Sequence, residues 1–309
     1  MSSPIIFCHY GNSDYLKYTL KSARYFNPGK EIILLGDSLN KDLANAENVR
    51  HIYLSNFESN SLIAKFENAY SHIAGSSHGR EFWLKFNFKR YYYIYAFLVN
   101  ESIDSFWYFD SDVLILSDLT TQEQKFNNFD FAVQSNINGF IKSSDSLLKY
   151  LLHNISAFSD KYFLMNQRNK IENNPSLALT EMATFKTFKQ NNLVKSIKLN
   201  TIINDETFDE CILYSDGMVM MMNGRNFKKI YCDIFGNIYC LDSITMKYVK
   251  MLALNMSGAN ALLLRKIYFT SLKSKYFKSL HIYFNRKFIF KFKYSFLTRV
   301  WHKVLSNLA

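Results

Sequence analysis

The sequence predicts an α/β fold with a mostly parallel central sheet, and two observations carry this prediction. Over the first 110 residues, short apolar runs that fit buried strands alternate with longer segments that fit helices, which is the pattern of βα units. The chain has 309 residues, of which 48% are hydrophobic and 20% are charged. It can therefore bury a sizeable core, and disorder is not expected.

The expected elements follow one another in order. Strands are expected at residues 5–8, 31–35, 49–54, 106–109 and 131–133, and helices at residues 13–26, 61–73 and 81–99. The first helix is expected to begin at a cap formed by Asn12 or Ser13, and a turn at residues 27–29 follows it. Residues 145–190 are expected to be mainly helical. Short strands are expected at residues 217–222, 229–232 and 238–241.

The four cysteines show neither a Cys-x-x-Cys spacing nor a nearby histidine pair. We therefore predict buried free thiols in a reducing compartment, in place of a zinc site or a disulfide framework. The first residues lack the basic start and the long apolar stretch of a signal peptide. The sequence contains no run of about 18 apolar residues, so a membrane-spanning helix is not expected. These features predict a cytoplasmic protein.

Charge is distributed unevenly along the chain, whose net charge is +11. Residues 1–242 carry 24 basic and 26 acidic side chains, whereas residues 243–309 carry 13 basic side chains and no acidic one. In the second stretch the cations alternate with Phe and Tyr, which suits an anionic membrane surface. We divide the chain into a main domain at 1–258 and a basic, aromatic-rich helical tail at 259–309.

This tail predicts peripheral attachment to the inner face of the plasma membrane. A solvated basic helix, or a tail that packs on the main domain, are the alternatives. Nucleic acid is not an expected partner, although it would also use cations and aromatic rings.

The most informative motif is Asp110-Ser111-Asp112, the only Asp-x-Asp in the chain. It directly follows the expected strand at 106–109, where open α/β sheets place their ligands. Two carboxylates about 4 Å apart repel by roughly 4 kcal/mol at an effective dielectric constant near 20. A divalent cation relieves this repulsion and keeps positions open for phosphate oxygens. A diphosphate bridged by that cation is a good leaving group.

The same local pattern occurs in phosphohydrolases of the haloacid dehalogenase class, where the first Asp is the nucleophile. In that class the motif normally opens the domain, whereas here about 100 residues of α/β sequence precede it. A phosphohydrolase is therefore the alternative enzyme.

Around this motif the chain resembles bacterial A-fold glycosyltransferases (the GT-A type with a DxD motif) of surface-polysaccharide and lipopolysaccharide biosynthesis. The resemblance covers roughly residues 4–258. It rests on Ile5–Asn12 as the first strand and loop, Leu34–Asp37 as the second strand end, and Lys85–Tyr95 as the helix before the motif. Thr180-Glu181-Met182 resembles a Thr-Asp-Met element, and Phe208-Asp209 resembles a Phe-Asp element.

The resemblance implies a nucleotide-sugar-binding fold, a UDP-sugar donor, a glycan or lipid-linked acceptor, and Mn²⁺ or Mg²⁺. It assigns the site residues as follows. The metal is held by Asp110, Asp112 and Asn255. The residues that bind the donor are His9, Tyr10, Asn12, Asp37, Lys85, Arg90, Ser111, Gln134 and Asn136. The catalytic residues are Glu181 and Asp209, one of which is expected to orient or deprotonate the acceptor. Gln134 and Asn136 follow the expected strand at 131–133, where their amides can meet sugar hydroxyls.

One segment departs from the family pattern. Related sequences often carry Leu-His-x-x-Gly-x-x-Lys near the end of the catalytic domain, where the His completes the metal shell and the Lys meets the diphosphate. In this chain Asn255 stands for the His and Ala261 for the Lys. An Asn carbonyl is a hard donor suited to Mg²⁺ or Mn²⁺, but one contact to the leaving group is lost. The non-enzyme alternative is therefore a catalytically inactive membrane-surface binding module.

Overall fold

The computed structural model describes residues 3–76, 81–190, 194–221, 227–233, 235–256, 261–271 and 290–291. It divides into two compact units, and each of them combines segments that are distant in sequence. Unit 1 comprises Met1–Gly11, Gly29–Asp110 and Thr120–Lys198, and unit 2 comprises Asn12–Pro28, Ser111–Leu119 and Leu199–Ala309.

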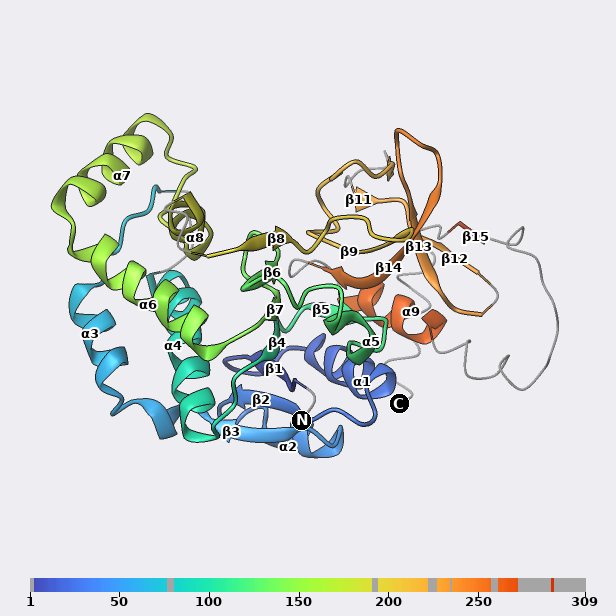
Figure 1. Ribbon diagram of the computed structural model, residues 1–309, viewed down its shortest axis with the longest axis horizontal. Helices are drawn as coiled ribbons and strands as arrows, with labels where there is room; N and C mark the ends of the chain where they lie inside the picture. Colours follow the sequence, from blue (N-terminus) through green and yellow to red (C-terminus); the bar gives the residue numbers. More distant parts are fainter. Residues whose placement is uncertain are drawn as a thin grey trace. The chain divides into compact units, whose positions relative to one another are not determined.

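Unit 1 is built on a seven-stranded mixed sheet with the order β3-β2-β1-β4-β7-β6-β8 (Figure 1). The strands are β1 (Ile5–Cys8), β2 (Ile32–Gly36), β3 (Arg50–Tyr53), β4 (Phe106–Phe109), β6 (Phe131–Val133), β7 (Gly139–Ile141) and β8 (Ser196–Lys198). Strands β1 to β4 pair in parallel, and so do β6 and β8, whereas β7 runs antiparallel to both β4 and β6. The predicted α/β fold with a mostly parallel sheet is confirmed.

Continuous apolar runs explain the central strands of this sheet. All four residues of β4 are buried, and so are all four of β1. A strand that is covered on both faces needs apolar side chains on both, which gives an unbroken apolar run in place of an alternating one. The aromatic run 106–109 therefore forms the strand that delivers Asp110.

Helices of unit 1 pack on this sheet and on one another. They are α2 (Lys41–Ala46), the 3₁₀ helix η1 (Leu54–Phe57), α3 (Ser61–Ala69), α4 (Glu81–Asn100), α5 (Thr120–Glu123), α6 (Ser144–Ser159), α7 (Lys161–Asn173) and α8 (Glu181–Gln190). Helix α4 packs against α3 and α6. Its buried rings join the core of unit 1, where Phe66 stacks on Tyr92 with a centroid distance of 4.5 Å. Residues 145–190 are mainly helical, as predicted.

Unit 2 contains a second sheet, with the order β15-β12-β13-β14-β5, in which β14 also pairs with β9. Its elements are α1 (Leu16–Phe26), β5 (Val113–Ile115), β9 (Glu206–Phe208), β10 (Met220–Met221), β11 (Phe227–Lys228), β12 (Tyr231–Cys232), β13 (Ile238–Leu241), β14 (Tyr248–Asn255), α9 (Ala261–Ser271) and β15 (Phe290–Lys291). Strand β14 runs antiparallel to β5, with Asn255 opposite Val113.

The predicted cap of the first helix is wrong. Helix α1 begins at Leu16, and its N-cap residue, Tyr15, makes no side-chain capping hydrogen bond. A turn precedes the helix, in which the N–H of Leu16 donates to the carbonyl of Ser13 at 3.0 Å. A polar residue near a helix start therefore does not fix the position of the first turn.

The beginning of the predicted tail belongs to the fold of unit 2. In α9, Leu263, Leu264 and Ile267 are buried in the hydrophobic core formed with β5, β12, β13 and β14. The backbone of β15 pairs with β12. Apart from residues 261–271 and 290–291, the tail at 259–309 lies outside the described residues, so its helical character and the boundary at 258 stay predictions.

Two properties concern the chain as a whole. The four cysteines, Cys8, Cys211, Cys232 and Cys240, are free and buried, as predicted. Among the residues that the structure describes, no helix combines the length and the apolar character needed to cross a bilayer.

Candidate functional site

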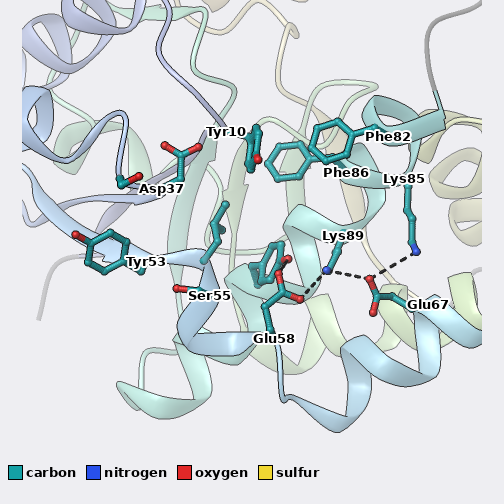
Figure 2. A pocket seen from close by; sticks show the side chains of 14 residues that line it. Tyr10, Asp37, Tyr53, Ser55, Glu58, Glu67, Phe82, Lys85, Phe86 and Lys89 are labelled. Carbon is teal, nitrogen blue, oxygen red and sulfur yellow. Dashed lines mark hydrogen bonds and ion pairs between the residues drawn. The ribbon is translucent and has the colours of Figure 1, made fainter.

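A pocket of about 640 Å³ lies in unit 1, outside the carboxyl ends of its parallel strands (Figure 2). Tyr10 follows β1, Asp37 follows β2 and Ser55 follows β3, and all three line the pocket together with residues of α3 and α4. After β3 the chain crosses back to β4 on the other side of β1. This reversal places the topological switch point of the sheet between β1 and β4, next to the β1 side of the pocket, and open α/β sheets bind ligands near such a point.

Hydrogen bonds fix the two loops that form one wall of the pocket. The Oδ2 atom of Asp37 accepts the N–H of Gly11 at 2.6 Å, and its Oδ1 atom accepts the N–H of Leu39 at 2.9 Å. The side chain of Asn40 donates to the carbonyl of Gly11 at 2.9 Å. Gly11 has a φ of 82°, a conformation that glycine adopts without steric cost. The loops after β1 and β2 are thus held to each other by one acid and one amide.

Glycine is required at the end of β2. A Cβ atom on Gly36 would lie 2.0 Å from Oδ1 of Asn40, far inside van der Waals contact. Asn40 is fully buried and its Oδ1 also contacts Nε2 of His51 at 2.9 Å. The bare backbone of Gly36 therefore lets the amide of Asn40 occupy the position that holds both loops.

His9, the first residue after β1, is buried beneath this wall. Its N–H donates to the carbonyl of Leu35 at 2.9 Å. Burial lowers the pKa of its imidazole to about 4, against the opposing effect of the Asp37 carboxylate. His9 is therefore neutral near pH 7 and adds no charge at the end of β1.

Aromatic rings form the rim of the pocket. The ring of Tyr10 meets the rings of Phe82 and Phe86 edge-on, with centroid distances of 5.1 and 6.0 Å. Tyr10 is 45% exposed and Phe82 is 49% exposed, so much of their surface faces outward. Partly exposed rings at a pocket offer apolar faces on which a planar ligand can stack.

Two lysines of α4 line the pocket but differ in their pairing. The Nζ atom of Lys89 lies 2.8 Å from Glu58 and 2.9 Å from Glu67, and its side chain is 14% exposed. Lys85 lies one turn earlier on the same helix, contacts Glu67 at the longer distance of 3.6 Å, and is 33% exposed (Figure 2). Lys89 is therefore a neutralised part of the wall, whereas Lys85 is the cation better placed to meet an anionic ligand.

A second polar cluster of unit 1 lies at the carboxyl end of β4. The carboxylate of Asp110 accepts four hydrogen bonds. Its Oδ1 atom accepts from Arg90 at 2.6 Å and from the hydroxyl of Tyr108 at 2.8 Å. Its Oδ2 atom accepts from the side-chain amides of Asn136 at 2.7 Å and Asn138 at 3.2 Å. An ionised carboxylate has about four lone-pair positions, so the donors occupy all of them.

The turn between β6 and β7 supplies both amides. Its residue Ile137 has a φ of 64°, in the left-handed region that a β-branched residue rarely adopts. Such a conformation costs on the order of 1–3 kcal/mol. The turn also lets Asn138 accept the N–H of Asp110 at 2.7 Å, and donate to the side chain of Gln134 at 3.1 Å. The strained turn thus forms hydrogen bonds with both the backbone and the side chain of Asp110.

Arg90 joins this cluster to α8. Its guanidinium donates to Oε1 of Glu181 at 3.1 Å as well as to Asp110, and it lies over the rings of Tyr91 and Tyr108. Burial raises the pKa of Glu181, while the charge of Arg90 lowers it. Within the described residues, the Oε2 atom of Glu181 and the Oδ1 atom of Asn136 are buried without a hydrogen-bond partner.

In unit 2, two predicted metal ligands lie at the same end of one strand pair. The carbonyl of Asp112, just before β5, accepts the N–H of Met256, just after β14, at 3.1 Å. Asn255 stands opposite Val113 in that pairing. Its side-chain amide donates to the carbonyl of Glu210 at 2.9 Å. The fold of unit 2 thus brings Asp112 and Asn255 together from positions far apart in the chain.

Asp209 is placed differently from the other predicted site residues of unit 2. It is fully buried, its Oδ1 atom lies 2.5 Å from the ammonium of Lys228, and its Oδ2 atom accepts the N–H of Asn255 at 3.1 Å. Burial raises its pKa to about 6, against the effect of Lys228. Asp216 also contacts Lys228, at 2.8 Å. A carboxylate enclosed in this way holds the end of β14.

The structure brings several predicted residues together within unit 1 and places others in unit 2. Tyr10, Asp37 and Lys85 line the pocket, and His9 is buried at the end of β1 without lining it. The cluster at the end of β4 contains Arg90, Asp110, Gln134, Asn136 and Glu181. Asn12 is exposed in unit 2. Ser111 is buried there, and its carbonyl accepts the hydroxyl of Thr19 at 2.7 Å.

Several residues of these sites were not predicted from the sequence, among them Glu58, Lys89, Asn138 and Lys228. Lys89 could have been found, since it lies four residues after Lys85 and thus on the same face of α4. The position of Asn138 depends on the strained turn, and that of Lys228 on strand pairing. Neither gives a sequence signal.

Within the described ranges, no group of three or more His, Cys, Asp or Glu side chains is arranged to hold a metal ion. No protein-family model matches the chain, and no curated protein matches it either.

Proposed function

We propose that the chain is a glycosyltransferase that takes a sugar from a nucleoside diphosphate donor, UDP by preference, and transfers it to a glycan or lipid-linked acceptor. The observation that carries this proposal is the pocket of unit 1 outside the carboxyl ends of β1, β2 and β3. Open α/β sheets bind ligands outside the carboxyl ends of their strands, and Tyr10 of this pocket follows β1, one of the two strands at the switch point. The A-fold resemblance of the sequence adds the reaction type.

The lining of the pocket suits the chemistry of a nucleotide. The rings of Tyr10 and Phe82 offer faces for a base, and the side chain of Asp37 lies beside them as an acceptor for hydroxyl groups. Lys85 provides a partly exposed ammonium for phosphate oxygens. A ligand pocket usually combines a mainly apolar lining with a few polar groups that fix orientation. We therefore assign the nucleoside end of the donor to this pocket.

The proposal includes a divalent cation, Mn²⁺ or Mg²⁺, and the residues differ in how well they suit it. Asp112 and Asn255 offer carboxylate and amide oxygens, which are the donors that hard cations prefer. Asp110 does not fit, because its four lone-pair positions are already occupied by donors. When bound, the cation would neutralise charge on the departing diphosphate. Asp112 and Asn255 are the residues proposed to hold it.

In the transfer step, the bond between the anomeric carbon and the diphosphate oxygen breaks, and a bond to the acceptor oxygen forms. The acceptor loses a proton, which requires a base. Both acids are buried and ion-paired. Glu181 suits this role better than Asp209, because its Oε2 atom has no partner among the described residues, whereas both oxygens of Asp209 accept hydrogen bonds. Burial raises the pKa of Glu181, which makes it a stronger base.

A phosphohydrolase would need Asp110 as a free nucleophile. Its oxygens are held by Arg90, Tyr108 and two amides, and a carboxylate so engaged is a poor nucleophile. We further propose attachment at the inner face of the plasma membrane through the basic tail, where a lipid-linked acceptor would be found.

The proposal is tested by calorimetry with UDP, in Mn²⁺ and in EDTA, together with an assay of donor hydrolysis. We expect micromolar to millimolar binding of UDP that depends on the cation. Equal affinity for UDP in EDTA and in Mn²⁺ would contradict the proposed requirement for a cation. Absence of UDP binding in both buffers, together with phosphate release from phosphomonoesters, would favour the phosphohydrolase. No binding and no activity would favour an inactive membrane-surface module.

A further inference from the structure

We infer that Asp110, the first carboxylate of the Asp-x-Asp motif, is a positioning residue that holds Arg90 and the β6–β7 turn, and that it does not ligate the cation. The part of this inference that concerns the cation rests on the proposed function. The part that concerns Arg90 and the turn stands on the hydrogen bonds of unit 1 alone.

The carboxylate of Asp110 is saturated with hydrogen-bond donors. Each oxygen of Asp110 accepts two hydrogen bonds, with donor–acceptor distances from 2.6 to 3.2 Å. A cation ligand must offer a lone pair, and a carboxylate has about four. A cation at Asp110 would therefore have to displace one of the four donors. Displacing Arg90 would leave a buried guanidinium with Glu181 as its one remaining carboxylate partner among the described residues.

The β6–β7 turn is arranged around Asp110. Asn138 is fully buried, accepts the N–H of Asp110, and donates to its Oδ2 atom. Asn136 donates to the same oxygen. Ile137 between them stands in a strained conformation that costs free energy. Two hydrogen bonds to a charged acceptor offset such a cost, so the carboxylate stabilises the turn.

Arg90 lies between two acids. Its guanidinium bridges Asp110, at the end of β4, and Glu181, the first residue of α8. The Arg90 side chain is 10% exposed, and breaking one contact of a buried ion pair is strongly destabilising. Asp110 therefore fixes the guanidinium and, through it, the start of α8 with the proposed base.

The test combines a stability cycle with a measurement of Mn²⁺ binding by electron paramagnetic resonance. Asp110→Asn should lower Tm by roughly 10 °C, as expected for a broken buried ion pair in a protein of this size. It should leave Mn²⁺ affinity within twofold. Asp112→Asn is the matched control, because it removes the same charge two residues away, and it should lower Mn²⁺ affinity at least tenfold with little change in Tm.

The cycle is completed by Arg90→Met and the double variant. Because the two residues act as one unit, the Tm loss of the double variant should be clearly smaller than the sum of the two single losses. Additive losses would overturn the positioning role. A tenfold loss of Mn²⁺ affinity in Asp110→Asn, with Tm unchanged, would show that Asp110 is a cation ligand.

If Asp110→Asn fails to fold, the Mn²⁺ affinity of Arg90→Met is used to test whether Asp110 ligates the cation. Freeing Oδ1 of Asp110 from the guanidinium should leave Mn²⁺ affinity within twofold, whereas a large loss would show that Arg90 orients a ligand. If the wild-type protein binds no Mn²⁺, the proposed cation requirement fails, and the stability cycle alone decides the role of Asp110.

Discussion

The carboxylate of Asp37 accepts the backbone N–H of Gly11 at 2.6 Å, and this contact ties the loop after β2 to the loop after β1. Both loops line the pocket proposed for the nucleoside. Asp37→Ala removes this bond together with the bond from Leu39, so we expect the affinity for UDP to fall at least tenfold, as measured by calorimetry. Asp42→Ala, an exposed acid on the nearby helix α2, is the matched control and should leave affinity unchanged. Equal affinity in the Asp37 variant would move the nucleoside out of this pocket.

The two pocket lysines should respond differently to substitution. Lys85→Ala should weaken UDP binding by about fivefold to tenfold, equivalent to roughly 1 kcal/mol, because it removes a partly exposed ammonium. Lys89→Ala should chiefly lower Tm, since it leaves Glu58 and Glu67 without their shared cation. Lys65→Ala, an exposed lysine on α3, serves as the control for general charge. If Lys89→Ala weakens binding more than Lys85→Ala does, the assignment of the phosphate-binding cation is reversed.

His9 should make the protein sensitive to acid. Its pKa is lowered from 6.5 to about 4 by burial, so the folded state favours the neutral imidazole. The associated stability is fully present above pH 6.5 and is lost as the pH falls from 6.5 towards 4, by up to about 3 kcal/mol. We expect the difference in Tm between pH 7 and pH 4.5 to shrink in His9→Asn. The exposed His72 provides the control, and an unchanged pH profile in the His9 variant would contradict the prediction.

Much of unit 1 follows from the sequence for a simple physical reason. Buried parallel strands need unbroken apolar runs, so residues 5–8 and 106–109 identify β1 and β4 directly, and Asp110 is then at a strand end. The pocket residues Tyr10 and Asp37 were predicted from the family resemblance, and each of them follows a strand of this sheet. Helix ends were less accurate, since α3 ends at Ala69 where the prediction extended it to residue 73.

The remaining features depend on contacts between distant segments. Asn138 reaches Asp110 only because the β6–β7 turn adopts a strained conformation at Ile137. The enclosure of Asp209 by Lys228 depends on strand β11, since nothing in the local sequence of either residue indicates a partner. Likewise, no linker or change of composition marks the division into two units, whose segments alternate along the chain. Sequence patterns report burial and turns, but they do not report which polar groups meet.

Asp112 should be needed for transfer but not for folding. Asp112→Asn keeps the shape of the side chain and removes one charge, so we expect donor hydrolysis and transfer to be lost while Tm stays level or rises. Differential scanning calorimetry and an assay of UDP release measure the two effects separately. A large fall in Tm would instead assign Asp112 a structural role.

The basic tail should be required for binding to anionic membranes, and the structure fixes where it can be cut. Helix α9 contributes buried leucines to the core of unit 2, so a deletion that starts at residue 262 would remove part of the fold. Deleting residues 272–309 spares α9 and removes nine basic and no acidic side chains. The shortened protein should still bind UDP but no longer sediment with vesicles that contain phosphatidylserine.

Because β15 pairs with β12, a variant that changes charge alone is the matched control for this deletion. The full-length chain with Lys273→Gln, Lys275→Gln and Lys278→Gln should bind the same vesicles more weakly, since each cation near an anionic surface contributes about 1 kcal/mol. Raising the salt concentration should weaken binding of the wild-type protein because it screens the charges. Binding should persist in part, because aromatic side chains insert independently of ionic strength. Unchanged sedimentation of both variants, or equal binding of the wild-type protein to neutral vesicles, would show that the charge of the tail does not direct the protein to the membrane.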